Sequence, residues 1–445
     1  MAGDVQATEG LPWRRAIAWL LFLGPFFFIS YGLANWYASE QADVPALVFD
    51  WERAIPFWAW TIVPYWSIDL LYGLSLFVCT TRRELDTHAK RLLTAQVVAI
   101  AWFVALPHRF SFERPASDGL FGAMFDALMG FDRPFNQIPS LHIALAVILW
   151  ALYARKLAGP ARVLADAWFV MIGASVLTTF QHHFIDIPTG LVLGWLCVWL
   201  WPFADDCPVE PWRAWQWSAD PARRRLAAYY AMGACVALTV AITIGGWGLW
   251  LSWVALSLLL VALAYAGFGV AGFQKRPDGR LSTAARWLLA PYLAGAWLNS
   301  RLWTRTHPEP VLIADGVWIG RVPSARALAA SPFAGVVDLC AELGIRPGKC
   351  QLVVVPVLDL TTPGAAALTD AANGIERLRG RGRVLVCCAL GYSRSACAVA
   401  AWLLLTQRAA TVESAIAMVR TARAQSVLSD KHVLALRAFR VNVAA

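Results

Sequence analysis

Residues 383–396 read Arg-Val-Leu-Val-Cys-Cys-Ala-Leu-Gly-Tyr-Ser-Arg-Ser-Ala. This stretch joins a Val-rich run, typical of a buried strand, to an apolar run from Ser393 to Leu405 that is typical of a helix. Within it, five residues separate Cys388 from Arg394, and Ser395 follows directly. A loop of this length can turn its backbone N–H groups inward as an anion site, and the helix adds the positive end of its dipole. We therefore expect a phosphate-binding loop around a nucleophilic cysteine.

The residue types in this loop suit cleavage of a phosphate ester through a thiolate. The guanidinium of Arg394 can hold two phosphate oxygens in a planar fork. The positive field of the loop also favours the thiolate form of Cys388, which is the nucleophilic form. The alternative is a buried structural cysteine beside a surface arginine. The position between a strand and a helix argues against that alternative.

The composition divides the chain into a membrane part and a soluble part. The chain has 445 residues, of which 59% are hydrophobic and only 15% are charged, and it contains 24 Trp. This is a membrane composition. Nearly all long apolar runs lie in residues 1–306, whereas residues 307–445 read as a soluble domain.

The soluble part alternates short β-rich runs with helix-like runs. The β-rich runs are residues 313–319, 334–339, 352–357 and 383–387, and the helix-like runs are residues 365–379, 393–406, 411–423 and 430–441. This alternation predicts an α/β domain with a central, mostly parallel sheet and helices on both faces.

Charge and cysteine usage exclude two classes of site. The net charge of +9 is spread over membrane loops, and no basic run is interleaved with aromatics, so we expect no nucleic-acid partner. The nine Cys have no metal-ligand spacing with His, so we expect neither a metal nor another cofactor. Three of them crowd the phosphate loop, which fits a reducing compartment better than a disulfide framework.

Eight apolar stretches approach the length of about 20 residues that crosses a bilayer. They cover residues 16–36, 57–79, 92–107, 141–155, 163–181, 188–204, 226–246 and 248–273. Arg and Lys gather in alternate loops, which places both the N-terminus and residues 307–445 in the cytoplasm. We expect the first stretch to be a retained helix rather than a cleaved signal. Residues 284–303 are apolar but interrupted by Pro291 and flanked by Arg, which predicts an amphipathic helix on the inner surface.

A second group of potentially catalytic residues lies in loops that this orientation places on the outer face of the membrane. It comprises Arg114-Pro115, Arg133-Pro134, Pro139-Ser140-Leu141-His142 and His182-His183-Phe184-Ile185-Asp186. On a helix, His182 and Asp186 share one face. A carboxylate beside an imidazole fixes its tautomer and makes the other ring nitrogen a better nucleophile, and a second His can protonate the leaving oxygen. The alternative, interfacial packing, is disfavoured because such groups are costly at membrane depth.

These motifs resemble the type-2 phosphatidic-acid phosphatase superfamily of six-span lipid phosphatases and phosphotransferases, over about residues 57–204. The resemblance implies that His182 is the nucleophile, Asp186 its orienting partner and His142 the general acid. It also implies that Arg114 holds the phosphate. The further residues expected to bind substrate are Arg133, Ser140 and His183.

Two departures from that pattern leave the reaction open. Pro107 stands where the phosphatase branch has Lys, and Val176 stands where it has Arg. Pro-Ser-x-His with a His-His-aromatic run is more similar to the inositol-phosphoceramide and sphingomyelin synthase branch, which transfers headgroups between lipids. Hydrolysis and transfer are therefore both possible at His182.

The loop at Cys388 resembles that of the dual-specificity protein-tyrosine phosphatase family, over about residues 310–440. The family implies a general-acid Asp on an upstream loop, for which Asp359 is the candidate. It also implies that Ser395 assists breakdown of a cysteinyl-phosphate. Within the loop, the residues expected to bind substrate are Gly391 and Ser393.

This loop also departs from the family pattern. The family signature begins His-Cys, and Cys387 occupies the His position. Three of the loop positions carry no charge, namely Ala389, Leu390 and Tyr392. Such a loop suits a monophosphate near a lipid surface, as in the phosphatidylglycerophosphate phosphatases of this family.

The two resemblances together predict a bacterial inner-membrane fusion protein of four parts. These are a membrane domain similar to six-span lipid phosphatases (1–204), two further transmembrane helices (205–283), a surface helix with a linker (284–306) and a dual-specificity phosphatase-like domain (307–445). Its expected partners are membrane lipids and a phosphorylated substrate.

Our main hypothesis is a bifunctional enzyme acting on phospholipid phosphate groups. Cys388 would act as a phosphomonoesterase on the cytoplasmic side, and His182 as a phosphatase or transferase on the periplasmic side. The alternatives are a membrane-anchored protein phosphatase in signalling and a catalytically decayed lipid-binding protein.

Overall fold

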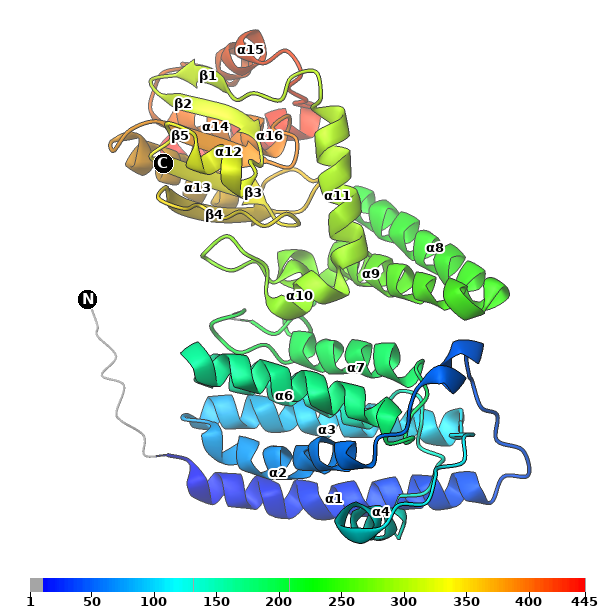
Figure 1. The fold of residues 1–445 in the computed structure, drawn as a ribbon. Coiled ribbons are helices and arrows are strands. Elements are labelled where there is room, and N and C mark those ends of the chain that lie inside the picture. The colour runs from blue at the N-terminus through cyan, green and yellow to red at the C-terminus, as the bar shows by residue number, and fades with distance from the viewer. Residues whose placement is uncertain (1–10, 131, 208, 445) are drawn as a thin grey trace. The chain divides into compact units, whose positions relative to one another are not determined.

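The computed structural model describes residues 11–130, 132–207 and 209–444. The chain divides into two compact units, Met1–Phe203 and Ala204–Ala445, which are described separately. In Figure 1 the first unit runs from blue to green and consists of helices, and the second runs from green to red and contains the sheet.

The first unit contains seven α-helices among its described residues. They are α1 (Trp13–Ser39), α2 (Ile62–Val78), α3 (Arg82–Ala105), α4 (Gly119–Met129), α5 (Leu141–Lys156), α6 (Gly159–Thr178) and α7 (Asp186–Leu200). Helices α5 and α7 approach very closely. A Cβ at Gly190 would lie 2.6 Å from the Ser140 carbonyl oxygen, and one at Gly194 would lie 2.7 Å from the Val147 Cβ. Glycine at these two positions therefore brings the start of α7 against the start of α5.

Five helices among the described residues are long and apolar enough to cross a membrane by length and composition. They span Trp13–Ser39, Ala59–Val78, Gly159–Thr178, Pro221–Ile244 and Gly246–Phe273. The other three predicted spans are also helical, but α5 and α7 have 16 and 15 residues, and α3 begins with a charged segment. At 1.5 Å per residue, α5 is about 24 Å long and shorter than a hydrocarbon core of about 30 Å. The five long helices indicate membrane association.

The second unit begins with a helical hairpin. Helix α8 (Pro221–Ile244) turns at Gly245 and Gly246, whose φ angles of 62° and 47° favour glycine, into the apolar segment Gly246–Phe273. That segment contains α9 (Leu251–Leu263), a π-helical turn η4 (Ala264–Phe268) and a 3₁₀ turn η5 (Gly269–Phe273).

The surface helix predicted over residues 284–303 is two helices, α10 (Thr283–Leu288) and α11 (Ala290–Trp303). The break falls at Leu289 because Pro291 has no N–H to continue the first helix and instead lies in the first turn of the second. Helix α11 is held against α9, since the Tyr292 amide donates to Ser257 Oγ at 3.3 Å.

A five-stranded mixed sheet forms the centre of the C-terminal part. Its strands are β1 (Val311–Ala314), β2 (Val317–Arg321), β3 (Gly335–Cys340), β4 (Gln351–Val357) and β5 (Val384–Cys388), in the order β1-β2-β5-β3-β4. Only β1 and β2 pair antiparallel. The run 313–319, expected as one β-rich stretch, is a hairpin, because Asp315 and Gly316 both take positive φ, as an Asp-Gly turn requires.

The helices cover the two sheet faces unequally. One face packs against α13 (Ala365–Arg379), α14 (Arg394–Leu405), α15 (Val412–Ala422) and α16 (Asp430–Ala444) around the fully buried Trp402. The other face packs against the short helix α12 (Ala325–Ala329), the segment around Leu343 and Ile345, and one side of α11. Strand β5 lies between β2 and β3, so its carboxyl end opens where ligands bind in α/β sheets.

A buried ion pair joins the segment after the hairpin to the sheet. Lys275 Nζ donates to Asp338 Oδ2 at 2.5 Å, to the Leu343 carbonyl at 2.8 Å and to the Cys340 carbonyl. The two charged side chains are 1% and 0% exposed. All three N–H donors of the ammonium group have acceptors. These hydrogen bonds and the ion pair therefore offset the free-energy cost of removing the two charges from water.

We predict that Lys275→Met lowers the stability of this unit by about 3–5 kcal/mol, because it leaves the Asp338 carboxylate buried and unpaired. The measurement is denaturant-induced unfolding of the full chain in detergent micelles. Lys349→Met is the control, because Lys349 is exposed. The double variant Lys275→Met/Asp338→Leu should recover part of the loss, and a single variant as stable as wild type would contradict the prediction.

Candidate active sites

The loop after β5 surrounds the Cys388 thiol with hydrogen-bonding groups. The Gly391 amide donates to Cys388 Sγ at 3.3 Å, and Ser395 Oγ lies 3.3 Å from the same sulfur. Gly391 has φ of 73°, and a Cβ there would lie 2.3 Å from the Gly320 carbonyl carbon. Only glycine therefore allows the loop to close against β2. Helix α14 begins at Arg394, so its N-terminal end follows the loop directly.

Arg394 is buried and held by two carboxylates. Its guanidinium donates to both oxygens of Glu342, at 2.9 and 2.7 Å, and to Asp359 Oδ1 at 2.7 Å. It also donates to the Val357 carbonyl at 2.8 Å. The structure thus brings together Cys388, Ser395, Arg394 and Asp359, the four residues predicted for catalysis here.

Glu342 is the member of this site that the sequence analysis missed. It lies just after β3, which pairs with the loop strand β5, and its side chain is 2% exposed. The available signal was a carboxylate directly after an apolar strand, at the same sheet edge as Cys388.

The two carboxylates differ in their electrostatics. Burial opposes ionisation of Glu342, but the charge and hydrogen bonds of Arg394 outweigh it and lower the Glu342 pKa. Burial raises the pKa of Asp359 in spite of the same guanidinium. A raised pKa suits Asp359 to donate a proton near neutral pH, whereas Glu342 stays ionised and holds Arg394 in place.

The acid loop is attached to the helical hairpin. The Tyr265 hydroxyl donates to the Asp359 carbonyl at 2.9 Å, and its ring, in the π-helical turn η4, is 1% exposed. Tyr230 of α8 stacks on Tyr265 with ring centroids 5.5 Å apart. Tyr292 of α11 packs edge-on against Tyr230 at 5.7 Å. The loop of the candidate general acid is thus bonded to Tyr265, which belongs to a cluster of three packed tyrosines from the hairpin and α11.

Two other predicted positions have structural partners. Ser393 Oγ lies 2.9 Å from His432 Nε2, and His432 Nδ1 accepts from the Ser429 amide at 3.2 Å. The Ser393 side chain is therefore engaged with α16 in this structure. Cys387 lies on the opposite sheet face from Cys388, packed near Cys340, and burial raises its pKa well above the ordinary value.

The second predicted site brings His182, Asp186 and Ser140 together. His182 Nδ1 lies 3.0 Å from Asp186 Oδ2, and Nε2 lies 3.2 Å from Ser140 Oγ. Asp186 begins α7, and the Ser140 hydroxyl caps α5 by accepting from the Ile143 amide. The close approach of the two helices at Gly190 thus assembles this triad.

His142 shares a cavity with His182. Its ring stacks on Tyr65 with centroids 4.2 Å apart, and its Nε2 is buried without a hydrogen-bond partner among the described residues. The cavity has a volume of about 260 Å³, and two carboxylates, Asp69 and Asp132, also line it.

The other three predicted substrate-binding residues of this unit lie elsewhere. His183 Nδ1 pairs with Glu52 Oε2 at 2.9 Å, and its Nε2 accepts from the Ser111 amide at 3.1 Å. The guanidinium of Arg114 lies over the Phe125 ring at 4.4 Å. That of Arg133 donates to Ser39 Oγ at 2.8 Å. None of the three is among the residues that line the cavity.

In the part of the chain that the structure describes, no three His, Cys, Asp or Glu side chains are grouped to hold a metal ion.

Comparison with known proteins identifies the C-terminal domain. The family model described as "Dual specificity phosphatase, catalytic domain" matches residues 318–442, so this part of the chain is a phosphatase domain of that type. The match begins eight residues after the start of the predicted range of 310–440 and ends two residues after its end. No curated protein matches the chain.

Several solved structures are similar to this domain. Tk-PTP in the active form is 27% identical, with 30% of this chain and 98% of that chain covered and a TM-score of 0.28. Human DUSP28 is 24% identical, with 31% and 97% covered and a TM-score of 0.28. PTPMT1 is 19% identical, with 31% and 96% covered and a TM-score of 0.28.

We predict that activity on an alkyl phosphate falls as pH rises through the Asp359 pKa, because a general acid must be protonated to act and burial raises this pKa. Asp359→Asn should lower kcat by about 100-fold or more and remove the alkaline limb of the pH profile. The measurement is kcat/KM against pH for both proteins. Asp370→Asn, at an exposed position of α13, is the matched control, and an alkaline limb that survives in Asp359→Asn would exclude Asp359 as the acid.

We also predict that Tyr265→Phe slows general-acid catalysis. A neutral hydrogen bond is worth about 1 kcal/mol, so its loss should lower kcat on an alkyl phosphate about fivefold. p-Nitrophenyl phosphate should be nearly unaffected, because its leaving group needs no proton. Tyr229→Phe, on an exposed side chain of α8, is the control. Equal losses on both substrates would show that Tyr265 does not act through Asp359.

Proposed function

We propose that the chain is a membrane-embedded phosphatase with two sites, both acting on phosphate groups of phospholipids. At the first site the Cys388 thiolate attacks phosphorus, and Asp359 gives its proton to the leaving alcohol oxygen. Asp359 takes up this proton from solvent when phosphate oxygens replace it on Arg394, while Glu342 keeps the guanidinium in place. Ser395 then assists as water, deprotonated by Asp359, releases phosphate from the cysteine.

The observation that best supports a lipid substrate is the hydrogen bond between the Tyr265 hydroxyl and the Asp359 carbonyl. Tyr265 belongs to Gly246–Phe273, a segment long and apolar enough to cross a bilayer. A general acid attached to the end of such a helix acts close to the membrane surface, where lipid headgroups carry the phosphate. The uncharged loop side chains beside Cys388 suit a single phosphomonoester.

At the second site we propose that His182 Nε2 attacks the phosphorus of a lipid phosphate, with Asp186 stabilising the imidazole and His142 protonating the leaving oxygen. The triad of Ser140, His182 and Asp186 and the shared cavity support these roles. Water or a second lipid alcohol would complete the reaction, as hydrolysis or headgroup transfer. Asp69 and Asp132 repel a phosphate while ionised, so its entry requires that they take up protons.

The charge of the loops supports an inner-membrane location with the Cys388 domain in the cytoplasm and the His182 site on the periplasmic side. The two sites would then act on opposite leaflets, on different lipids or on two stages of one pathway.

The test is turnover of phosphatidic acid, phosphatidylglycerophosphate, phosphatidylinositol phosphate and a phosphotyrosyl peptide by the purified full chain in mixed micelles. We expect Cys388→Ser to lose phosphate release by about 1,000-fold or more, as for removal of a nucleophile. We expect His182→Ala to lose a different conversion, whose product distinguishes hydrolysis from transfer. Cys235→Ser, at an exposed cysteine, and His108→Ala, outside the cavity, are controls.

Each outcome decides between hypotheses. Turnover of the phosphopeptide alone would make the chain a membrane-anchored protein phosphatase. If neither variant differed from wild type, both site assignments would be wrong and lipid binding without catalysis would replace them.

A further inference from the structure

Helix α11 faces outward with apolar side chains. Its large exposed residues are Trp297, Leu298, Leu302 and Trp303, each more than half exposed. Its inward contacts are made by small side chains: Ala296 packs on the sheet, and Ser300, which is fully buried, donates to the Ala389 carbonyl at 2.5 Å. This arrangement is the reverse of a water-exposed helix. With 14 residues, α11 is about 21 Å long and too short to span a bilayer of about 30 Å.

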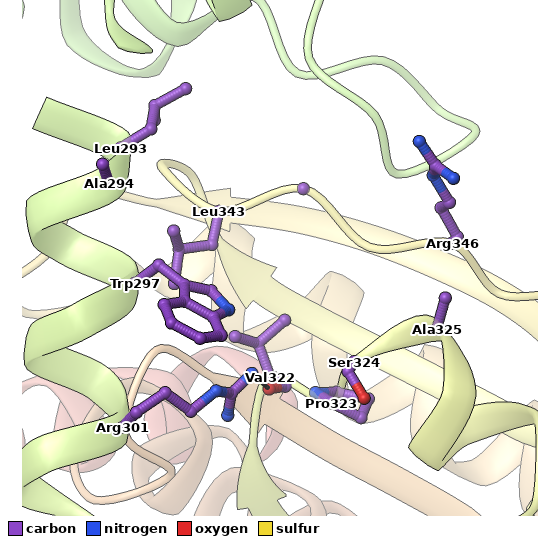
Figure 2. Close-up of a pocket in the computed structure, with 11 residues that line it drawn as sticks. Leu293, Ala294, Trp297, Arg301, Val322, Pro323, Ser324, Ala325, Leu343 and Arg346 are labelled. Atoms are coloured by element: carbon purple, nitrogen blue, oxygen red, sulfur yellow. Dashed lines mark hydrogen bonds between the residues drawn. The ribbon is translucent and has the colours of Figure 1, made fainter. Parts of the chain in front are cut away.

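A pocket of about 410 Å³ lies between α11 and the edge of the phosphatase domain, and we call it the α11 pocket. Figure 2 shows Leu293 and Trp297 on its helix side and Arg346 on the opposite loop. Val322 and Leu343 form its floor between them. The pocket therefore combines an apolar wall with two arginines, of which Arg301 is the second.

The charge in this pocket is unbalanced. Neither Arg301 nor Arg346 forms an ion pair with a carboxylate among the described residues, and none of the described lining residues is acidic. Arg301 Nη2 donates to the Val322 carbonyl at 3.0 Å, and its guanidinium lies 5.3 Å from the centre of the Trp297 ring. Arg321 lies near enough to lower the Arg301 pKa together with burial, so a third positive charge adds to the local field. An anion entering the pocket would meet no repelling carboxylate.

We propose that the α11 pocket binds an anionic phospholipid from the bilayer surface, separately from the Cys388 site. Arg301 and Arg346 hold the lipid phosphate, and Leu293 and Trp297 contact its glycerol and upper acyl region. Two observations select a lipid over a soluble anion. The exposed apolar side of α11 continues from the pocket, and the helix is bonded through Ser257 to Gly246–Phe273, a segment long enough to cross a membrane. Tryptophan with nearby arginine is typical of membrane interfaces.

The pocket is connected to the catalytic loop through the backbone. Arg301 holds the Val322 carbonyl, and the Val322 amide donates to the Cys388 carbonyl at 2.8 Å. Ser300, adjacent in α11, holds the next carbonyl of the loop, that of Ala389. A lipid bound at Arg301 is thus two hydrogen bonds from the nucleophile, so it steadies the loop when the enzyme is seated on an anionic surface. Lipid binding itself does not depend on the proposed catalytic function.

The test is photolabelling of the full chain in nanodiscs with a phosphatidylglycerol that carries a diazirine in its acyl chain, followed by peptide mapping. We expect label on peptides containing residues 293–301 or 343–346. Arg301→Gln and Arg346→Gln should each reduce that label about tenfold, as expected for loss of a charge-assisted contact to phosphate. Arg377→Gln removes the same charge from an exposed position of α13 and should leave the label unchanged. Arg346 makes no hydrogen bond to the catalytic loop, so its variant separates lost binding from a disturbed fold.

Competition with unlabelled compounds distinguishes binding of a lipid phosphate from binding of a soluble phosphate. Excess unlabelled phosphatidylglycerol should remove the label, whereas phosphatidylcholine should not. Glycerol phosphate or inorganic phosphate competing as well as the lipid would overturn the proposal in favour of a soluble anion. Equal labelling of wild type and both arginine variants, or equal labelling by a phosphatidylcholine probe, would overturn it altogether.

Discussion

The Cys388 site is organised around one buried guanidinium. Arg394 is 2% exposed, and a cation so deeply buried is tolerated only with opposite charge beside it. Glu342 supplies that charge from the end of β3 and Asp359 supplies it from the loop after β4. The same group thereby fixes the relative positions of three loops at one sheet edge. It also leaves one carboxylate, Asp359, partly exposed and exchangeable for an incoming phosphate.

Three attachments connect this sheet edge to segments that lie outside the phosphatase domain. Tyr265 holds the acid loop, Lys275 holds the end of β3, and Ser300 holds the catalytic loop. Each attachment uses a buried polar group, so separating the parts would expose or orphan donors that now have partners. The phosphatase domain is therefore attached to these segments at the sheet edge that holds its catalytic residues. The hydrogen bond from Tyr265 links the conformation of the hairpin directly to the Asp359 loop.

Contacts between residues close in sequence could be predicted, whereas contacts between residues far apart in sequence could not. Cys388, Arg394 and Ser395 lie within eight residues, so loop geometry alone brings them together. Most of the strands followed from β-rich runs, except that an Asp-Gly turn divided the first run into a hairpin. Glu342 and Tyr265 reach the site through tertiary contacts that no local pattern encodes.

The same reasoning explains the second site. His182, Asp186 and Ser140 do meet. The helical spacing assumed for the first two is not how they meet, because His182 lies in the loop before α7, which begins at Asp186. Arg114 and Arg133 were assigned by resemblance, and here an aromatic face and a serine hydroxyl satisfy them instead.

The two sites consequently balance charge in opposite ways. At Cys388 the Arg394 guanidinium is already present, so a phosphate takes the place of Asp359 on a cation, and Asp359 must carry a proton to act as the acid. At His182 the cavity holds imidazoles and carboxylates without a guanidinium, so under the proposed function a phosphate enters together with protons. On our proposal, phosphate binding depends on proton uptake at both sites, by Asp359 at the first and by Asp69 and Asp132 at the second. On our proposal, the two sites therefore differ in whether a cation is already present to receive the phosphate.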